Sequence, residues 1–356
     1  MDGASEIFDF DTPIERRGTH ATKWDRMEAL YGVSPEDGIP MWVADMDFRP
    51  PPAVNAALRE AAEHGVHGYF SGETEHKAAL CDWLLTRHGW EVDPDWIATT
   101  HGVVPGGFVH ALNAFSEPDD GVILFSPVYH AFYRVLRANR RRIVESPLEI
   151  HDGRYRMNLE ALASKLDGTE RIVALCSPHN PGGTLWSRAE IRTLADFCRA
   201  HDLILVADEI HQDLVLPGGT HLPSAVAAPD ALDRLVVLTA GTKTFNLAGA
   251  LIGYAIIPDP GLRARYAEAH RASGAGLHRL SVLMATAAYQ NGAAWLDALL
   301  VYLEGNARHL ESALAAIPGV RPMPLEATYL CWADFSGTGM EQAEIVARIQ
   351  GDARIA

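Results

Sequence analysis

A lysine that could do chemistry follows an apolar run late in this sequence. Lys243 comes shortly after residues 235–238 (LVVL) and lies among small and hydroxylated residues. The run predicts a buried strand, so the amine should lie just past a strand end, partly withdrawn from water. Burial lowers the pKa of a lysine, and a neutral amine can form a Schiff base with an aldehyde cofactor. Taken alone, Lys243 would more often be a solvated loop lysine.

Two earlier strand ends supply further polar groups. The apolar run 171–176 leads to Asn180, and the run 203–207 leads to Asp208. Because the carboxyl ends of parallel strands share one edge, where ligands bind, we expect these two residues to converge with Lys243. The trio suits pyridoxal phosphate: a lysine for the aldehyde, a carboxylate for the pyridine nitrogen and an amide for the phenolic oxygen. A cofactor-free α/β binding protein would require their convergence to be a coincidence.

Composition excludes several classes of partner. The 356 residues carry a net charge of −16, from 30 basic and 46 acidic side chains, which argues against nucleic acid or an anionic membrane. The four cysteines have no metal-type spacing, the start Met1–Glu6 lacks the regions of a signal peptide, and no apolar run reaches membrane-spanning length. We therefore expect a soluble, cytoplasmic protein without a metal site.

The elements that must position these side chains alternate between strand and helix. The alternation from about 95 to 257 predicts an α/β fold with a mixed, mainly parallel sheet, whose strand at 252–257 is antiparallel. Short strands are expected at 41–43 and 328–335, and an amphipathic helix at 295–314 should bridge to a small C-terminal unit. We divide the chain into an N-terminal arm (1–50), a large domain (51–290), and a bridging helix with a small domain (291–356).

Two strand exits could contact other parts of the cofactor. Pro105 suits the first position of a helix, so the backbone N–H groups of Val103 and Val104 could hold a phosphate there. Tyr129 follows the strand 121–125 and could stack on a planar pyridine ring. His211 lies three residues after the aspartate; it could support the cofactor or substrate, or merely pack beside the sheet.

Short motifs along the chain extend this pattern. They are RGT at 17–19, KWD at 23–25, PMWVADMDF at 40–48, GVVP at 102–105, SPVY at 126–129, NPGG at 180–183, DEIH at 208–211 and KTFNLAG at 243–249. Their order and spacing resemble the fold type I pyridoxal-phosphate enzymes of the class I/II aminotransferase superfamily, and within it the cystathionine β-lyase-like carbon–sulfur lyase branch. The resemblance runs from about Arg17 to the chain end.

The resemblance implies further roles. The fold would be a three-layer, pyridoxal-phosphate-dependent transferase-like large domain, with a small α+β domain formed by the arm and the C-terminal segment. The backbone of Ala44 would line the substrate carboxylate, and Thr242 would contact the cofactor. In a homodimer, Tyr69 would reach the cofactor phosphate of the other subunit; a tyrosine packed at the surface of a turn is the alternative. We expect Lys23, Trp24 and Asp25 to anchor the arm rather than to do chemistry.

The sequence departs from the family pattern at two places. Aspartate-aminotransferase relatives have a phosphate-binding arginine eight residues after the lysine, where this chain has Leu251. Relatives also carry a late arginine that binds the substrate carboxylate bidentately, and this sequence stops at Ala356, just before that segment. Because such a clamp provides orientation as well as charge pairing, one expectation is a truncated homologue that binds the cofactor with little activity.

The resemblance points to one reaction class above the others. It implies an enzyme that cleaves cystathionine or related cysteine S-conjugates to a thiol, pyruvate and ammonia, with Lys243 as the catalytic base and an amino acid as substrate. An aminotransferase would use the same residues and stays open as an alternative.

Overall fold

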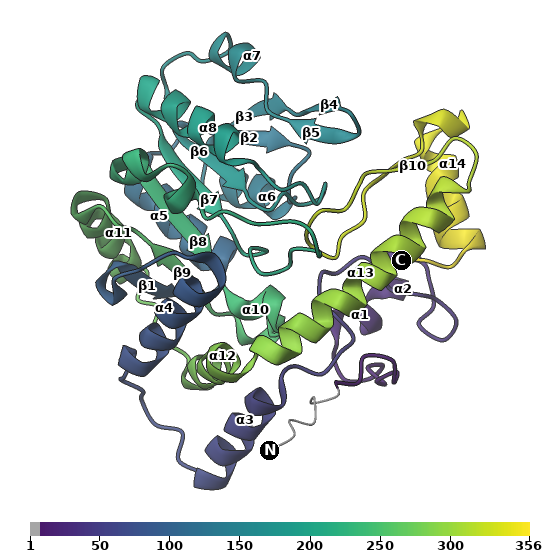
Figure 1. Cartoon of the computed structure of the whole chain (residues 1–356), viewed down its shortest axis with the longest axis horizontal. Coiled ribbons are helices and arrows are strands. Elements are labelled where there is room, and N and C mark those ends of the chain that lie inside the picture. Colours follow the sequence, from purple (N-terminus) through teal and green to yellow (C-terminus); the bar gives the residue numbers. More distant parts are fainter. Residues whose placement is uncertain (1–7) are drawn as a thin grey trace.

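The computed structural model describes residues 8–356, so the start Met1–Glu6 and the beginning of the predicted arm lie outside the described residues. Within that range a seven-stranded sheet runs through the body of the molecule (Figure 1). Its strands, in spatial order, are β1 (Ile97–Thr100), β9 (Gly253–Ile256), β8 (Leu235–Thr239), β7 (Ile204–Asp208), β6 (Glu170–Cys176), β2 (Gly121–Ser126) and β3 (Arg142–Pro147).

The direction of the strands confirms the predicted mixed, mainly parallel sheet. Strands β3, β2, β6, β7 and β8 are parallel to one another. Strand β9 is antiparallel to both β8 and β1, as the run at 252–257 predicted. The carboxyl ends of β6, β7 and β8 therefore lie side by side at one edge of the sheet.

Both faces of the sheet are covered because its strands are apolar on both sides. Ile123, Val173 and Leu205 belong to the core on the face covered by α8. Their neighbours along the strands, such as Val122 and Ile172, belong to the core that includes α5, α6 and α11. Continuous apolar runs of this kind are typical of parallel strands buried between helical layers. The molecule is thus a three-layer α/β protein.

Helices of 4 to 23 residues connect the strands and cover the sheet. Their bounds are α1 (Thr22–Asp25), α2 (Met27–Tyr31), α3 (Pro52–His64), α4 (Thr74–His88), α5 (Val109–Phe115), α6 (Ala131–Ala138), α7 (Leu159–Ala163), α8 (Arg188–Ala200), α9 (Ser224–Ala227), α10 (Gly241–Thr244), α11 (Pro260–Ala272), α12 (Arg279–Asn291), α13 (Ala293–Ala315) and α14 (Gln342–Ala347). Across residues 8–356, none of the helices combines the length and the apolar character needed to span a membrane.

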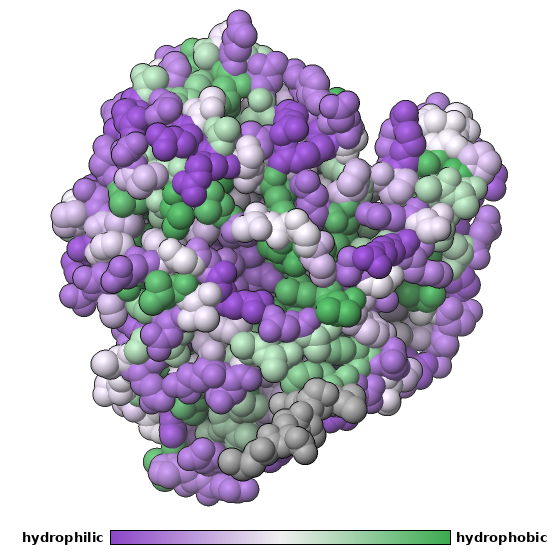
Figure 2. Space-filling view, in the orientation of Figure 1, coloured by the Kyte–Doolittle hydropathy of each residue, from purple (hydrophilic) through white to green (hydrophobic). Residues whose placement is uncertain are grey.

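The long helix α13 leads from the body to a smaller unit (Figure 1). This unit contains α14 and the short pair β10 (Arg321–Pro322) and β11 (Ala333–Asp334). The N-terminal arm meets the end of the chain there: Ile39 pairs with Ile355, and the Met41 N–H donates to the Ala356 carbonyl at 2.7 Å. Figure 2 shows a notch between this unit and the body.

Three local predictions were wrong. Residues 41–43 form no strand, because the Met41 N–H bonds to the chain end rather than to a ladder. Of the strand expected at 328–335, only β11 forms, since Thr328 adopts a φ of +73° and breaks the extended run. The turn after β1 becomes helical at Val103 rather than at Pro105, as the φ of +80° at Gly102 permits an earlier start.

Candidate active site

The structure places the three predicted polar residues at the same edge of the sheet. Asp208 ends β7, and its register partners are Cys176 at the end of β6 and Leu238 near the end of β8. Asn180 follows β6 and is half-buried, and Lys243 lies in the short helix α10 immediately after β8. The three side chains lie at or just beyond the carboxyl ends of three adjacent parallel strands.

Asp208 is a buried carboxyl with few partners. It is 4% exposed and accepts one hydrogen bond, from the Ile210 N–H at 3.1 Å. Burial raises its pKa to about 7, an effect that Glu209 reinforces and Lys243 opposes. No lysine or arginine within residues 8–356 forms an ion pair with it. A ligand that brings a protonated ring nitrogen would supply the missing partner.

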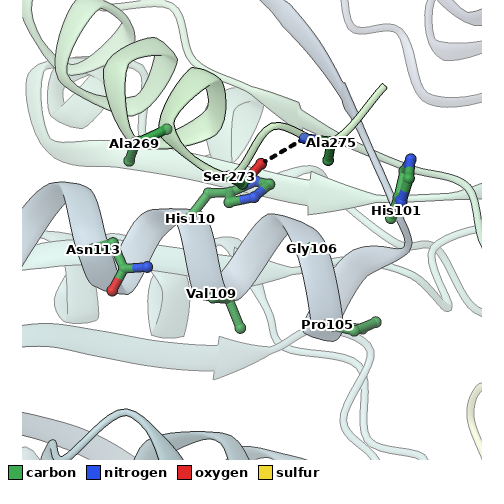
Figure 3. A pocket seen from close by; sticks show the side chains of 10 residues that line it. His101, Pro105, Gly106, Val109, His110, Asn113, Ala269, Ser273 and Ala275 are labelled. Atoms are coloured by element: carbon green, nitrogen blue, oxygen red, sulfur yellow. Dashed lines mark hydrogen bonds between the residues drawn. The ribbon is translucent and has the colours of Figure 1, made fainter. Parts of the chain in front are cut away.

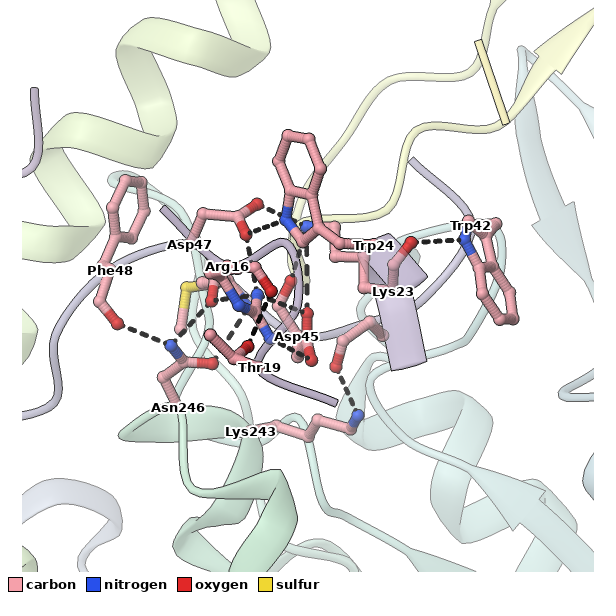
Figure 4. Close-up of polar contacts among 12 residues, drawn as sticks. Arg16, Thr19, Lys23, Trp24, Trp42, Asp45, Asp47, Phe48, Lys243 and Asn246 are labelled. Carbon is pink, nitrogen blue, oxygen red and sulfur yellow. Dashed lines mark hydrogen bonds and ion pairs between the residues drawn. The ribbon is translucent and has the colours of Figure 1, made fainter. Parts of the chain in front are cut away.

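Lys243 is held close to this carboxyl. Its Nζ donates to the Ala44 carbonyl at 2.5 Å (Figure 4). Burial lowers the pKa of Lys243, whereas the charges of Asp45 and Asp208 raise it, and burial prevails. A larger fraction of the amine is therefore neutral at a given pH than for an ordinary lysine, as a nucleophile or a base requires.

Two residues that the sequence analysis did not assign hold the segment around Ala44. Asn246 accepts a hydrogen bond from the Met46 N–H at 2.9 Å and donates to the carbonyls of Met46 and Phe48, each at 2.8 Å. The Tyr329 hydroxyl donates to the Ala44 carbonyl at 2.9 Å. A positive φ of +57° at Asn246, three residues after the lysine, aims this amide at the arm.

Ion pairs within the arm brace the same segment (Figure 4). Arg16 binds Asp45 at 3.0 Å and Asp47 at 2.7 Å. Lys23 binds Asp47 at 2.7 Å, and the Trp24 indole N–H donates to that carboxylate at 3.0 Å. Lys23 and Trp24 thus bind the first part of the arm to residues 45–47, whereas Asp25 accepts from the Gly18 N–H at 2.8 Å within that first part.

The predicted phosphate cradle is a helical turn, η2 (Val103–Phe108), that follows β1. Val103 and Val104 are buried at its start, where backbone N–H groups have no acceptor within the helix. Gly253 of β9 lies directly against the turn: a Cβ there would be 2.7 Å from the Gly102 carbonyl carbon and 2.9 Å from the Val103 nitrogen. The close approach therefore requires glycine at this position.

Three further predicted residues lie around this edge. Tyr129 follows β2 and is 36% exposed; burial first, and the charge of Asp208 second, raise its pKa. His211 is buried, and its Nδ1 has no hydrogen-bond partner within residues 8–356. Burial lowers the pKa of His211 to about 3, so the ring is neutral at physiological pH. Thr242 is buried beside Lys243 in α10.

Tyr69 stands apart from these residues. Its side chain is fully exposed, in a loop between α3 and α4. In a single chain it does not cover the strand ends.

A cavity of about 500 Å³ lies elsewhere, between α5 and α11 (Figure 3). His101, His110, Asn113 and Ser273 supply its polar side chains. Asn180, Asp208 and Lys243 do not line it. In the described part of the chain, no three His, Cys, Asp or Glu side chains are grouped to hold a metal ion.

The groups at the strand ends fit pyridoxal phosphate. A buried carboxyl without a cation suits the pyridine nitrogen, and a buried amine of lowered pKa suits the aldehyde. Free N–H groups at the start of η2 suit the phosphate. The unpartnered Nδ1 of His211 leaves one further polar group for the cofactor or the substrate.

This fold and site define a class, and the chain belongs to the aminotransferase class I and II family, whose model matches residues 36–352. It is 42% identical to the cystathionine β-lyase PatB of Bacillus subtilis over 343 residues, which cover 96% of this chain and 88% of the relative.

Two solved structures are also similar to it. Cystalysin from Treponema denticola, which contains pyridoxal 5'-phosphate, has 32% identity and a TM-score of 0.93 and matches 98% of this chain and 89% of its own. The pyridoxal-phosphate-bound C–S lyase from Staphylococcus hominis has 30% identity and a TM-score of 0.89, with coverage of 99% and 90%.

Substituting Gly253 with alanine tests the cradle. We expect the affinity for pyridoxal phosphate to fall about tenfold or more, because the added methyl would push Gly102 and Val103 out of place at a cost of about 1–3 kcal/mol. Calorimetric titration of the full chain, freed of cofactor, measures the change. Gly305→Ala is the matched control, since a Cβ there meets no atom within 4 Å. Equal affinities for G253A, G305A and the unmodified protein would contradict the assignment.

Proposed function

We propose that this protein is a pyridoxal-phosphate-dependent carbon–sulfur β-lyase that cleaves cystathionine or related cysteine S-conjugates to a thiol, pyruvate and ammonia. The observation that carries the proposal is the buried pair at the strand ends: a carboxyl that forms no ion pair within residues 8–356 and an amine of lowered pKa. The 42% sequence identity of the chain to a cystathionine β-lyase, over 96% of its length, supports the same reaction class.

Each part of the cofactor has a residue suited to hold it. Asp208 would hold a proton on the pyridine nitrogen, and Asn180 would donate to the phenolic oxygen. The N–H groups of Val103 and Val104 would bind the phosphate, with Tyr129 lying on the ring. When bound, pyridoxal phosphate supplies the electron sink that stabilises negative charge at the substrate Cα.

Lys243 carries the proton chemistry in this proposal. With pyridoxal phosphate bound, Lys243 would be the residue that holds the aldehyde, and the substrate amino group would displace it. The freed, neutral amine would then take the Cα proton, and the electron pair of the Cβ–S bond would leave with sulfur. Water completes the reaction by releasing pyruvate and ammonia. The backbone at Ala44, fixed by Asn246, would orient the substrate carboxylate.

Pyruvate release without a keto acid tests the reaction class. We expect the protein to form thiol and pyruvate in equal amounts from cystathionine, and Lys243→Ala to lower the rate about a thousandfold or more, since it removes both the attachment point and the base. Lys165→Ala, at an exposed position, is the control. Strict dependence on an added keto acid would indicate an aminotransferase, and a visible cofactor absorbance that persists in K243A would refute the role of Lys243.

We also propose that two copies of the chain form a homodimer in which Tyr69 reaches the phosphate site of the partner. Two exposed apolar side chains of one loop support the homodimer. Tyr69 is fully exposed, and Val66 is 63% exposed. Arg279 donates to the Val66 carbonyl at 2.6 Å and fixes the base of the loop. A large aromatic side chain presented on a fixed loop is suited to a partner surface.

Hybrid dimers test this sharing. We expect Tyr69→Ala and Lys243→Ala proteins to be poorly active separately, and a refolded equal mixture to regain about a quarter of the unmodified activity, because half of the dimers are hybrids with one intact site. Activity is compared before and after mixing. If Tyr69 instead contributes to the site of its own chain, one site of each hybrid lacks Tyr69 and the other lacks Lys243. Mixing would then restore no activity.

A further inference from the structure

The carbonyl of Ala44 accepts two hydrogen bonds from distant parts of the chain. Lys243 Nζ donates at 2.5 Å and the Tyr329 hydroxyl at 2.9 Å. The lysine comes from α10 at the edge of the sheet, and the tyrosine comes from the segment between β10 and β11. The acceptor itself belongs to the N-terminal arm. Three separate regions therefore meet at one oxygen atom.

An unusual backbone conformation aims Tyr329 at this oxygen. Thr328 is fully buried and has a φ of +73°, a region that β-branched residues rarely adopt. Its N–H donates to the Leu214 carbonyl at 2.6 Å, and its hydroxyl accepts from the Leu330 N–H at 3.1 Å. Backbone strain of this kind persists only where the surroundings hold it in place, and it concentrates at functional sites.

Tyr329 is well suited to act as a steady donor. Burial first, and the charge of Asp45 second, raise its pKa, so the hydroxyl keeps its proton throughout the physiological range. Its ring also lies edge-on to His211, with 6.3 Å between the ring centroids. The side chain thus contacts two groups of the site without being one of the predicted cofactor ligands.

We propose that Tyr329 is a positioning residue that limits how strongly the Ala44 carbonyl holds the amine of Lys243, and thereby sets the pH at which this amine attaches to the cofactor. A carbonyl that accepts from two donors binds each more weakly than it would bind either alone. Without the hydroxyl, the carbonyl would hold the charged form of Lys243 more firmly and raise its pKa. The inference rests on the proposed function, since it requires an aldehyde cofactor.

The other groups around Lys243 do not depend on Tyr329 for their charge. Asp45, from the arm, and Asp208, from β7, both raise the pKa of the lysine. Arg16 pairs with Asp45 at 3.0 Å. His211 is neutral because burial lowers its pKa. Removal of the Tyr329 hydroxyl alone should therefore change the pKa of Lys243 only through the Ala44 carbonyl that the two side chains share.

The test follows attachment rather than turnover. The full chain, freed of cofactor, is mixed with pyridoxal phosphate, and the rate at which the visible absorbance appears is measured against pH. In Tyr329→Phe we expect the amine to attach about three- to tenfold more slowly at neutral pH, a change equivalent to the loss of one hydrogen bond. The pH profile should move to higher pH, because the pKa of Lys243 rises. Tyr302→Phe, which removes a hydroxyl bonded to Asp11 away from the site, should leave the profile unchanged.

A second substitution preserves the shape of the side chain. 3-Fluorotyrosine at position 329 is a stronger donor than tyrosine, so the profile should move to lower pH. An unshifted profile in Y329F, or a shift in the same direction for both substitutions, would overturn the proposal. Failure of the unmodified protein to develop any absorbance would instead refute the proposed function.

Discussion

The structure depends on a buried carboxyl group that forms no ion pair with any lysine or arginine of residues 8–356. Asp208 ends a central strand, and the one hydrogen bond that it accepts comes from its own loop. Burial of an ionised carboxylate is costly, and the raised pKa of about 7 expresses that cost. A protonated pyridine nitrogen would compensate for it, so the site is built to be completed by a ligand rather than by another side chain of the chain.

The rest of the site holds the amine of Lys243 close to the carboxyl of Asp208. Parallel strands place α10 beside the end of β7, which brings Lys243 near Asp208. The arm lies over the amine: Asn246 binds it to the body, and the ion pairs of Arg16 and Lys23 brace it internally. Functional side chains on strand ends and on tethered segments need little reorganisation when a ligand binds.

The sequence predicted the sheet and its polar edge because both follow from local pattern. The apolar runs before Asn180, Asp208 and Lys243 are long enough to be buried on both faces, and parallel strands then bring their exits together. The three-layer fold and the antiparallel strand near 252–257 were also predicted correctly.

The remaining contacts depend on tertiary structure. Alternating apolar residues at 328–335 suggested a strand, but the left-handed conformation at Thr328 depends on a contact with Leu214. The bond from Tyr329 to Ala44 spans 285 positions and has no local pattern. Asn246 lies within a motif of the sequence, but only its φ of +57° shows that its amide binds the arm.

The protonation state of the bound cofactor tests the central interaction most directly. Nuclear magnetic resonance of pyridoxal phosphate labelled with ¹⁵N in its ring reports whether that nitrogen carries a proton. We expect a protonated nitrogen at neutral pH in the unmodified protein and an unprotonated one in Asp208→Asn, because only the carboxylate stabilises the positive charge. An unprotonated nitrogen in the unmodified protein would contradict the role assigned to Asp208.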